Sequence, residues 1–287
     1  MGVLNLRQRR QNSCYERKDK QMIENDDEAS QETLNALAAQ IDSASRIVVF
    51  TGAGISTESG IADFRSPGGI WTKIQPIQFS EFLNSEETRL EYWRRRFYFQ
   101  KEFDAAPINA GHQSVATIIN SDKGVGLITQ NIDGLHQRSG ISDHDIVEIH
   151  GNGVRAICLE CNSPMSLQQA ETMIEQTGVS PRCSRCNGLI KSAVISFGQP
   201  MPQDKLIDAE AMVQNCDLCL VLGSSLVVQP AAGLPLVAKN CGSKLVIINK
   251  QPTPLDPICD LLVGASIGPT LEKALEKTTL ADLSAIN

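Results

Sequence analysis

The chain has 287 residues, of which 41% are hydrophobic and 21% are charged, and its net charge is −7. This length accommodates one large domain and a small one, with a core that does not depend on disulfides. The negative charge argues against non-specific binding to nucleic acid or to an anionic membrane surface, so we expect neither partner.

The N-terminal tail, residues 1–30, mixes basic and acidic side chains, and we expect it to be disordered. A targeting peptide is the alternative, although such peptides contain few acids. The chain has no apolar run that could span a bilayer and no secretory signal. Five cysteines lie outside the two Cys-x-x-Cys pairs described below and show no pairing logic, namely Cys14, Cys216, Cys219, Cys241 and Cys259. Because Cys216 and Cys219 lie in an apolar run, we expect free core thiols and a reducing compartment, with disulfides as the alternative. That compartment is the cytoplasm or, in a eukaryote, the mitochondrial matrix.

The first elements follow from apolar spacing. Residues 31–43 have the pattern of an amphipathic helix, and the apolar run 46–50 predicts a buried parallel strand that ends in a glycine turn. An aromatic segment over 77–103 predicts helical structure, within a helical insert at about 66–110. Further elements are predicted by the same criteria, namely a helix over 111–120 and strands at 126–129, 146–149, 190–197, 217–222 and 244–248.

Strands that alternate with helices predict an α/β fold, a Rossmann-like doubly wound parallel sheet. The pattern breaks over 152–189, where we expect a small inserted zinc-binding module. The larger, Rossmann-like domain would then comprise 31–151 and 190–287.

The module contains two Cys-x-x-Cys pairs, Cys158/Cys161 and Cys183/Cys186. Tetrahedral zinc takes four thiolates, and each pair can hold one edge of the metal. Because the pairs include no histidine or carboxylate, we expect one structural zinc ion without an open catalytic position. A redox role for either pair is the alternative, and two pairs at this separation disfavour it.

Two groups of residues follow predicted strands. The turn Gly52-Ala53-Gly54 allows close approach to a pyrophosphate, although a purely structural turn explains it almost as well. His150 ends a strand, and Gln130, Asn131 and Asp133 end another. Ligand sites in such sheets lie at the carboxyl ends of the strands, and a neutral imidazole suits general-base catalysis. For an isolated histidine, a structural role in the core is the alternative.

Together these residues resemble the sirtuin family of NAD-dependent protein deacylases, over roughly residues 34–275. The shared motifs, in chain order, are Gly52-Ala53-Gly54-Ile55-Ser56, Gly60-Ile61-Ala62-Asp63-Phe64-Arg65, Thr129-Gln130-Asn131-Ile132-Asp133, His150-Gly151, the four cysteines, Phe197-Gly198 and Gly223-Ser224-Ser225-Leu226. The stretch 76–94 looks most like the class II branch, which includes sirtuin-4. Two departures are Ala62, where the family usually has proline, and Gln199, where it often has an acid.

The resemblance implies that NAD, as co-substrate, lies across the switch point of the sheet. Arg65 would press on the pyrophosphate and Phe64 would cover the nicotinamide pocket. Asn249 would meet the adenine ribose and Ile267 would reach the adenine end. The remaining implied contacts are Gly52, Ala53, Gly54, Gly223, Ser224 and Ser225.

The same resemblance implies the catalytic roles. Asp133 would bind the carboxamide, Asn131 and Gln130 would orient the nicotinamide ribose, and His150 would be the general base. An acyl-lysine protein or peptide would add as an extended strand near 197–198 and 227–228.

The implied function is NAD-dependent protein lysine deacylation that releases nicotinamide and O-acyl-ADP-ribose. Mono-ADP-ribosyl transfer to protein is one alternative, and a catalytically silent NAD-binding interaction protein is another. Tyr92/Arg95 or Trp93/Arg96 could correspond to a Tyr-x-x-Arg pair that binds acidic acyl groups. We expect acetyl or apolar acyl groups to be preferred, and a solvated helix face at Arg94–Arg96.

Overall fold

The computed structural model describes residues 28–72 and 74–281. The expected N-terminal tail therefore lies outside the described residues for all but its last three positions, 28–30. None of the helices in the described ranges is long and apolar enough to cross a membrane.

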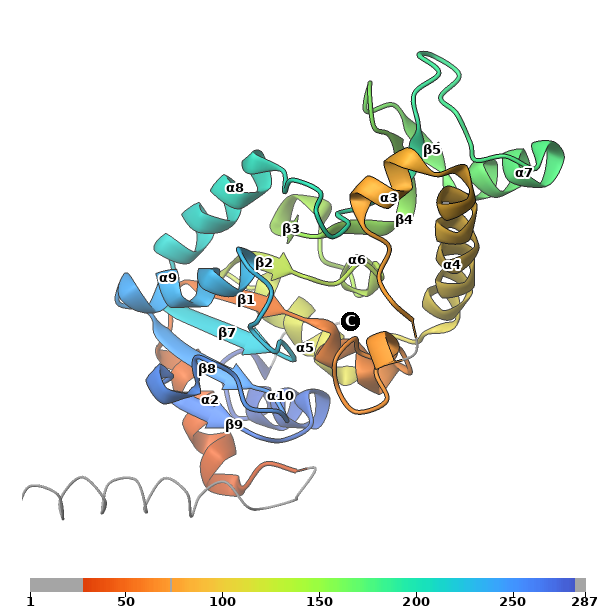
Figure 1. The fold of residues 1–287 in the computed structure, drawn as a ribbon. Helices are drawn as coiled ribbons and strands as arrows, with labels where there is room; N and C mark the ends of the chain where they lie inside the picture. Colours follow the sequence, from red (N-terminus) through yellow and green to blue (C-terminus); the bar gives the residue numbers. More distant parts are fainter. Residues whose placement is uncertain (1–27, 73, 282–287) are drawn as a thin grey trace, which may run out of the picture.

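A six-stranded parallel sheet forms the centre of the larger domain (Figure 1). Its strands lie in the order β3-β2-β1-β7-β8-β9, which confirms the predicted doubly wound fold. β1 and β7 are neighbours at the centre of the sheet. The strands that follow β1 in the sequence, β2 and β3, extend the sheet on one side, and those that follow β7, β8 and β9, extend it on the other. The strands are β1 (Ile47–Thr51), β2 (Gly124–Thr129), β3 (Ile146–Glu148), β7 (Leu218–Leu222), β8 (Lys244–Ile248) and β9 (Leu261–Val263).

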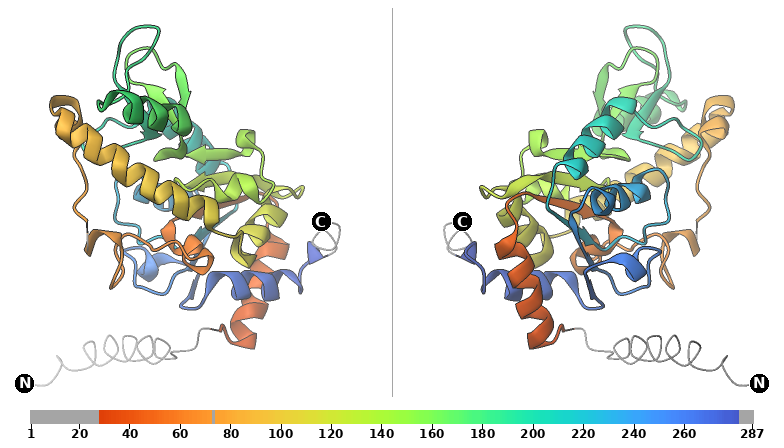
Figure 2. Two further views of the ribbon diagram at one scale, coloured as in Figure 1. Left: turned by 90° about the vertical axis from the view of Figure 1, so that its right-hand side faces the viewer. Right: turned by 90° about the vertical axis from the view of Figure 1, so that its left-hand side faces the viewer.

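Helices cover both faces of this sheet (Figures 1 and 2). Val49 and Leu220 pack toward α2 (Gln31–Ser43), α5 (Ala110–Ile119) and α10 (Ile267–Leu275). Phe50 and Val221 point to the opposite face, toward α8 (Gln203–Gln214) and α9 (Leu234–Asn240). Shorter helices complete this part of the chain, namely α6 (Leu135–Arg138), η1 (Ala53–Ser59), η2 (Ile70–Thr72), η3 (Asp143–Asp145), η4 (Ala231–Gly233) and η5 (Asp256–Ile258).

A second, antiparallel sheet has the order β5-β4-β6, with α7 (Leu167–Thr177) beside it. It consists of β4 (Gly151–Cys158), β5 (Pro164–Ser166) and β6 (Ile190–Val194). We expected an apolar strand over 190–197 to join the parallel sheet, but β6 pairs with β4 and ends at Val194. An apolar run looks the same whichever sheet it joins, and the cysteine pairs hold the start of β6 beside the end of β4.

The aromatic segment forms two helices, α3 (Phe79–Asn84) and α4 (Glu86–Ala105), where one helical stretch was predicted. The Ser85 side chain caps α4 by accepting a hydrogen bond from Thr88 N. Figure 2 shows α4 extending along both parts of the molecule. Its Trp93 is fully buried in the core of the small sheet. Arg96 is 5% exposed, so the expected solvated face is wrong at that position.

Candidate functional site

The turns after β1 and β7 touch one another through glycine. Gly223 has φ 64°, and a Cβ there would lie 2.5 Å from the backbone nitrogen of Ile55. A Cβ on Gly54 would lie 2.7 Å from the Cα of Gly223. No larger residue fits either position, because the close approach excludes a side chain at both, and at Gly223 the positive φ would strain one as well. The contact places the first glycine turn at the switch point of the sheet.

A cavity of about 390 Å³ opens at this contact. Its volume falls within the range typical of small-molecule sites. Most of the sequence-predicted contacts line it, namely Ala53, Gly54, Phe64, Arg65, Gln130, Asn131, His150, Gly223, Ser224, Ser225 and Asn249. Gly52 does not line it but lies against Gly223 and Ser224 in the turn. Ile267, the first residue of α10, does not line it either, because its side chain is buried in the hydrophobic core.

His150 follows β3 and faces the cavity. Its Nδ1 lies 3.2 Å from the carbonyl oxygen of Gln130, which can only accept, so Nδ1 donates and Nε2 is left as the basic nitrogen. Burial lowers the pKa of His150, and the charge of Arg65 lowers it further, while the bond to Gln130 opposes both effects. The imidazole is therefore neutral at neutral pH, as a general base must be.

Gln130 connects the strand ends on either side of β1. The Ser224 hydroxyl donates to Oε1 of Gln130 at 2.7 Å, and the Gln130 N–H donates to the Thr51 carbonyl at 2.9 Å. The segment after β2 is thus fixed to the segments after β1 and β7. Its polar groups are held in place before any ligand arrives, which is the preorganisation that binding sites require.

Asp133 lies in a smaller adjoining cavity of about 130 Å³, with Asn131 and Ser56. It is 6% exposed, and its carboxylate accepts hydrogen bonds from the Ser56 hydroxyl at 2.7 Å and from Leu135 N at 2.9 Å. Burial raises the pKa of Asp133, and these bonds oppose that effect. Ser56 had no predicted role, although it belongs to the glycine motif that the sequence analysis singled out.

The loop after η1 carries Phe64 and Arg65. Asp63 does not pair with Arg65 as a surface ion pair; its carboxylate accepts the backbone N–H groups of Arg65 and Ser66 at 2.9 and 2.8 Å and so shapes the loop. The Arg65 guanidinium lies 4.0 Å from the centre of the Trp71 ring. Trp71 also contacts Phe64 and Phe197, at centroid distances of 5.3 and 5.2 Å. The Trp71 ring therefore packs against the Arg65 guanidinium, and Arg65 lines the cavity.

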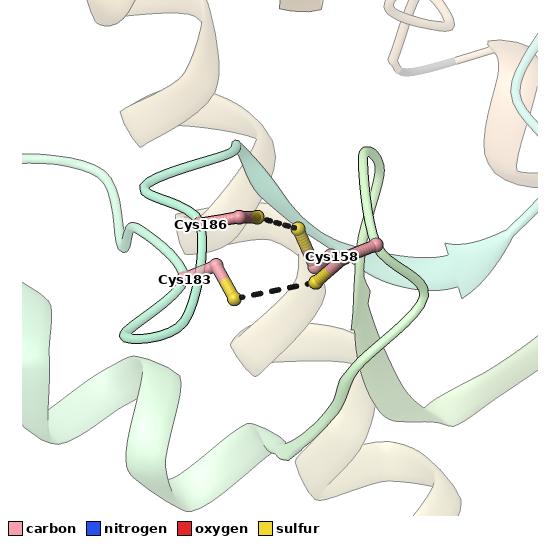
Figure 3. A group of neighbouring side chains, drawn as sticks. Cys158, Cys183 and Cys186 are labelled. Carbon is pink, nitrogen blue, oxygen red and sulfur yellow. Dashed lines mark hydrogen bonds between the residues drawn. The ribbon is translucent and has the colours of Figure 1, made fainter.

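The four predicted metal ligands come together at the far end of β4. Their sulfur atoms all lie within 4.8 Å of one another, and Figure 3 shows three of them pointing toward a common centre. Cys158 and Cys186 are 3.4 Å apart and Cys161 and Cys183 are 3.7 Å apart. A tetrahedral ZnS₄ site with Zn–S bonds of about 2.3 Å has S···S distances of about 3.8 Å. The cluster therefore fits one structural zinc ion.

Comparison with known proteins agrees with this geometry. A model of the Sir2 family matches residues 52–230, more than half of the chain. The chain belongs to the Sir2 family.

Two bacterial members of the Sir2 family are similar over most of their length. An NAD-dependent protein deacetylase of Rhodopseudomonas palustris is 50% identical over 82% of this chain and 93% of its own. The NAD-dependent protein deacetylase 1 of Bradyrhizobium diazoefficiens is 48% identical over 82% of this chain and 92% of its own. The finer class II likeness stays a prediction.

A solved structure of Sir2 with a p53 peptide and NAD⁺ superposes with a TM-score of 0.74 and 34% identity. The matched region covers 85% of this chain and 98% of the chain in that structure. Another Sir2 structure, bound to a propionylated peptide, gives a TM-score of 0.72 and 33% identity, with the same coverage of the two chains, 85% and 98%.

Proposed function

We propose that this chain is an NAD-dependent protein lysine deacylase that releases nicotinamide and O-acyl-ADP-ribose. The names of its Sir2 relatives support this function. The observation that carries it is the arrangement of one cavity, in which the basic Nε2 of His150 and the side chain of Asn131 meet the glycine contact of Gly54 and Gly223.

The cavity fits a dinucleotide, because glycine leaves room for a pyrophosphate near exposed Arg65. Ala53, Gly54, Ser224 and the neighbouring turn residues hold the phosphates and the ribose in this proposal. Asn249 is 7% exposed and lines the same cavity, where it would meet the adenine ribose. No role remains for the Ile267 side chain.

Bound NAD supplies a ribose carbon from which nicotinamide can leave. Asp133, which lines the smaller cavity together with Asn131 and Phe64, would receive the carboxamide there. Gln130 and Asn131 would hold the ribose hydroxyls. The acyl oxygen of the substrate lysine would bond to the ribose carbon as nicotinamide leaves, and Nε2 of His150 would then accept the proton that a ribose hydroxyl gives up when its oxygen attacks the acyl carbon. Water provides the atoms that complete release of the free lysine.

The acyl-lysine peptide enters along the exposed rim between the two parts of the molecule. Phe197 is 40% exposed and Val227 is 53% exposed, and Phe197 and Val228 line the cavity. An extended peptide between these segments would present its lysine to His150.

We place the domain boundaries near 151 and 194, because β4 to β6 form one sheet.

We place the protein in the cytoplasm, or in the mitochondrial matrix of a eukaryote. Cys219 in β7 and Cys216 just before it are both buried free thiols, which supports a reducing compartment.

The proposal is tested by incubating the purified chain with NAD and acyl-lysine peptides while nicotinamide release and product masses are measured together. Deacylation gives one O-acyl-ADP-ribose for each nicotinamide released. ADP-ribose retained on protein would favour mono-ADP-ribosyl transfer instead. NAD binding without nicotinamide release would favour the other alternative, a catalytically silent NAD-binding interaction protein.

A further inference from the structure

Three side chains without a role so far join the ends of β1 and β2 beneath Asn131. The Thr51 hydroxyl donates to the Thr129 hydroxyl at 2.8 Å, and Nε2 of His136 lies 3.0 Å from the Thr51 oxygen. The Thr129 oxygen in turn accepts the backbone N–H of Asn131 at 3.0 Å. Thr51, Thr129 and His136 are 0%, 3% and 2% exposed, so water does not compete for these bonds.

Counting protons fixes the direction of each bond. Thr51 has one hydroxyl proton and gives it to Thr129, so Nε2 of His136 must carry a proton and donate it to Thr51. Nδ1 of His136 has no partner, which a neutral ring tolerates better than a charged one. Burial, together with the neighbouring His112 ring, holds the pKa of His136 well below its ordinary value.

A second set of hydrogen bonds, through Ser56 and Asp133, holds the side chain of Asn131. Ser56 gives its only hydroxyl proton to Asp133, so Nδ2 of Asn131 donates to the Ser56 oxygen at 3.2 Å. Asp133 accepts the N–H of Leu135, which directly precedes His136. The backbone N–H of Asn131 and one N–H of its side-chain NH₂ are therefore held, which orients its amide oxygen for a ligand.

We propose that Thr51, Thr129 and His136 are positioning residues that fix Asn131 so that its amide oxygen accepts from the ribose hydroxyls. This inference rests on the proposed function. None of the three residues lines the cavity, and they act through Asn131 alone. Because the glycine turns and Ser224 are untouched, losing the network lowers kcat and leaves the KM for NAD nearly unchanged.

The test compares Thr51→Val, which removes the hydroxyl at constant shape, with Thr51→Ser, which keeps it. Thr270→Val is the matched control, because the Thr270 hydroxyl is equally buried in α10 and has no partner. We expect Thr51→Val to lower kcat for nicotinamide release about 10- to 100-fold, as small misplacements of catalytic groups do. Thr51→Ser and Thr270→Val should stay close to wild type, and melting temperatures establish that each variant is folded.

A Thr51→Val kcat equal to that of Thr270→Val, or a Thr51→Ser variant as slow as Thr51→Val, would overturn the inference. If Thr51→Val does not fold, His136→Phe removes the donor while filling the ring's volume, and the same comparison applies. Exchange of the Asn131 backbone N–H, which Thr129 accepts, followed by NMR without NAD, separates this inference from the proposed function. Faster exchange in Thr51→Val than in Thr51→Ser supports the network even if wild type proves inactive, and equal exchange contradicts it.

Discussion

Burial shifts the pKa of two ionisable side chains at the two cavities, His150 and Asp133. His150 loses part of its affinity for a proton because its charged form is poorly solvated, and its bond to Gln130 fixes which nitrogen is basic. Asp133 experiences the same desolvation, but Ser56 and Leu135 N stabilise its charged form. The two groups can therefore differ in role although both are largely enclosed.

We expect His150→Ala to abolish deacylation while leaving NAD binding largely intact. A positioned general base contributes roughly 10²–10⁴-fold to the rate. The matched control is His144→Ala, because His144 is exposed in η3, away from the cavity. Turnover by steady-state nicotinamide release and NAD affinity by calorimetry measure the two effects. Wild-type-like turnover in His150→Ala would exclude His150 as the base.

The pH dependence follows from the direction of the His150 pKa. Protonation removes the basic nitrogen, so kcat/KM falls as the pH falls through this pKa. Because burial lowers the pKa, we expect the acidic limb of the profile to have its midpoint below about 6.5, the ordinary value for histidine. A midpoint well above that value, measured with a neutral acyl peptide, would contradict this assignment.

At the scale of elements, the turn after β7 must be glycine for two independent reasons. We expect Gly223→Ala to lower stability by about 2–5 kcal/mol, from backbone strain together with overlap against Gly54 and Ile55. Gly242→Ala is the control, because Gly242 has φ 97° but no atom within 4 Å of the added Cβ. Denaturant melts of both variants separate overlap from strain. Equal losses would mean that the glycine contact is unimportant.

The cysteine cluster stabilises the small sheet where β4 ends and β6 begins. We expect one zinc ion per chain, and Cys183→Ser should release it and lower the melting temperature or cause aggregation, because metal binding is coupled to folding. Cys241→Ser provides the control, since Cys241 is an exposed free thiol outside the cluster. Metal analysis and thermal melts measure both effects. Active wild-type protein without zinc would refute the structural role.

At the scale of the whole molecule, residues that follow strands of the parallel sheet line the cavity together with Val194 of β6 and the segment after it. The helix α4 lies beside both sheets (Figure 2). Arg89 of α4 is 7% exposed and bonds to Glu86 and to Ser180 of the small domain. Trp93 is fully buried in the core of the small sheet and lines neither of the two cavities, so it does not contact an acyl group bound there.

We expect acetyl and apolar acyl groups to be preferred over succinyl. Tyr92 already hydrogen-bonds Ser192, and Arg95 bonds Glu91 and the Gln75 carbonyl. Neither side chain lines the two cavities, so a buried acyl carboxylate would lack these partners, at a cost of about 1–3 kcal/mol. The measurement is kcat/KM for acetyl, octanoyl and succinyl forms of one peptide.

A succinyl preference would contradict that expectation, and two variants would locate its cause. Loss of the preference in Arg95→Ala would mean that the pair rearranges. Loss in Arg96→Met would instead assign the carboxylate to Arg96, which lines the smaller cavity with two nitrogens unpartnered.

The sequence by itself determined the parallel sheet, the cysteine cluster and the motif residues that line the cavity, because apolar periodicity, cysteine spacing and strand-end motifs are local signals. Tertiary structure decided the rest. β6 joined the small sheet, Arg96 became buried, and Ile267 turned into the core. Ser56 met Asn131 across 75 positions of sequence. Such contacts depend on which surfaces meet when distant segments pack, and no local pattern records that choice.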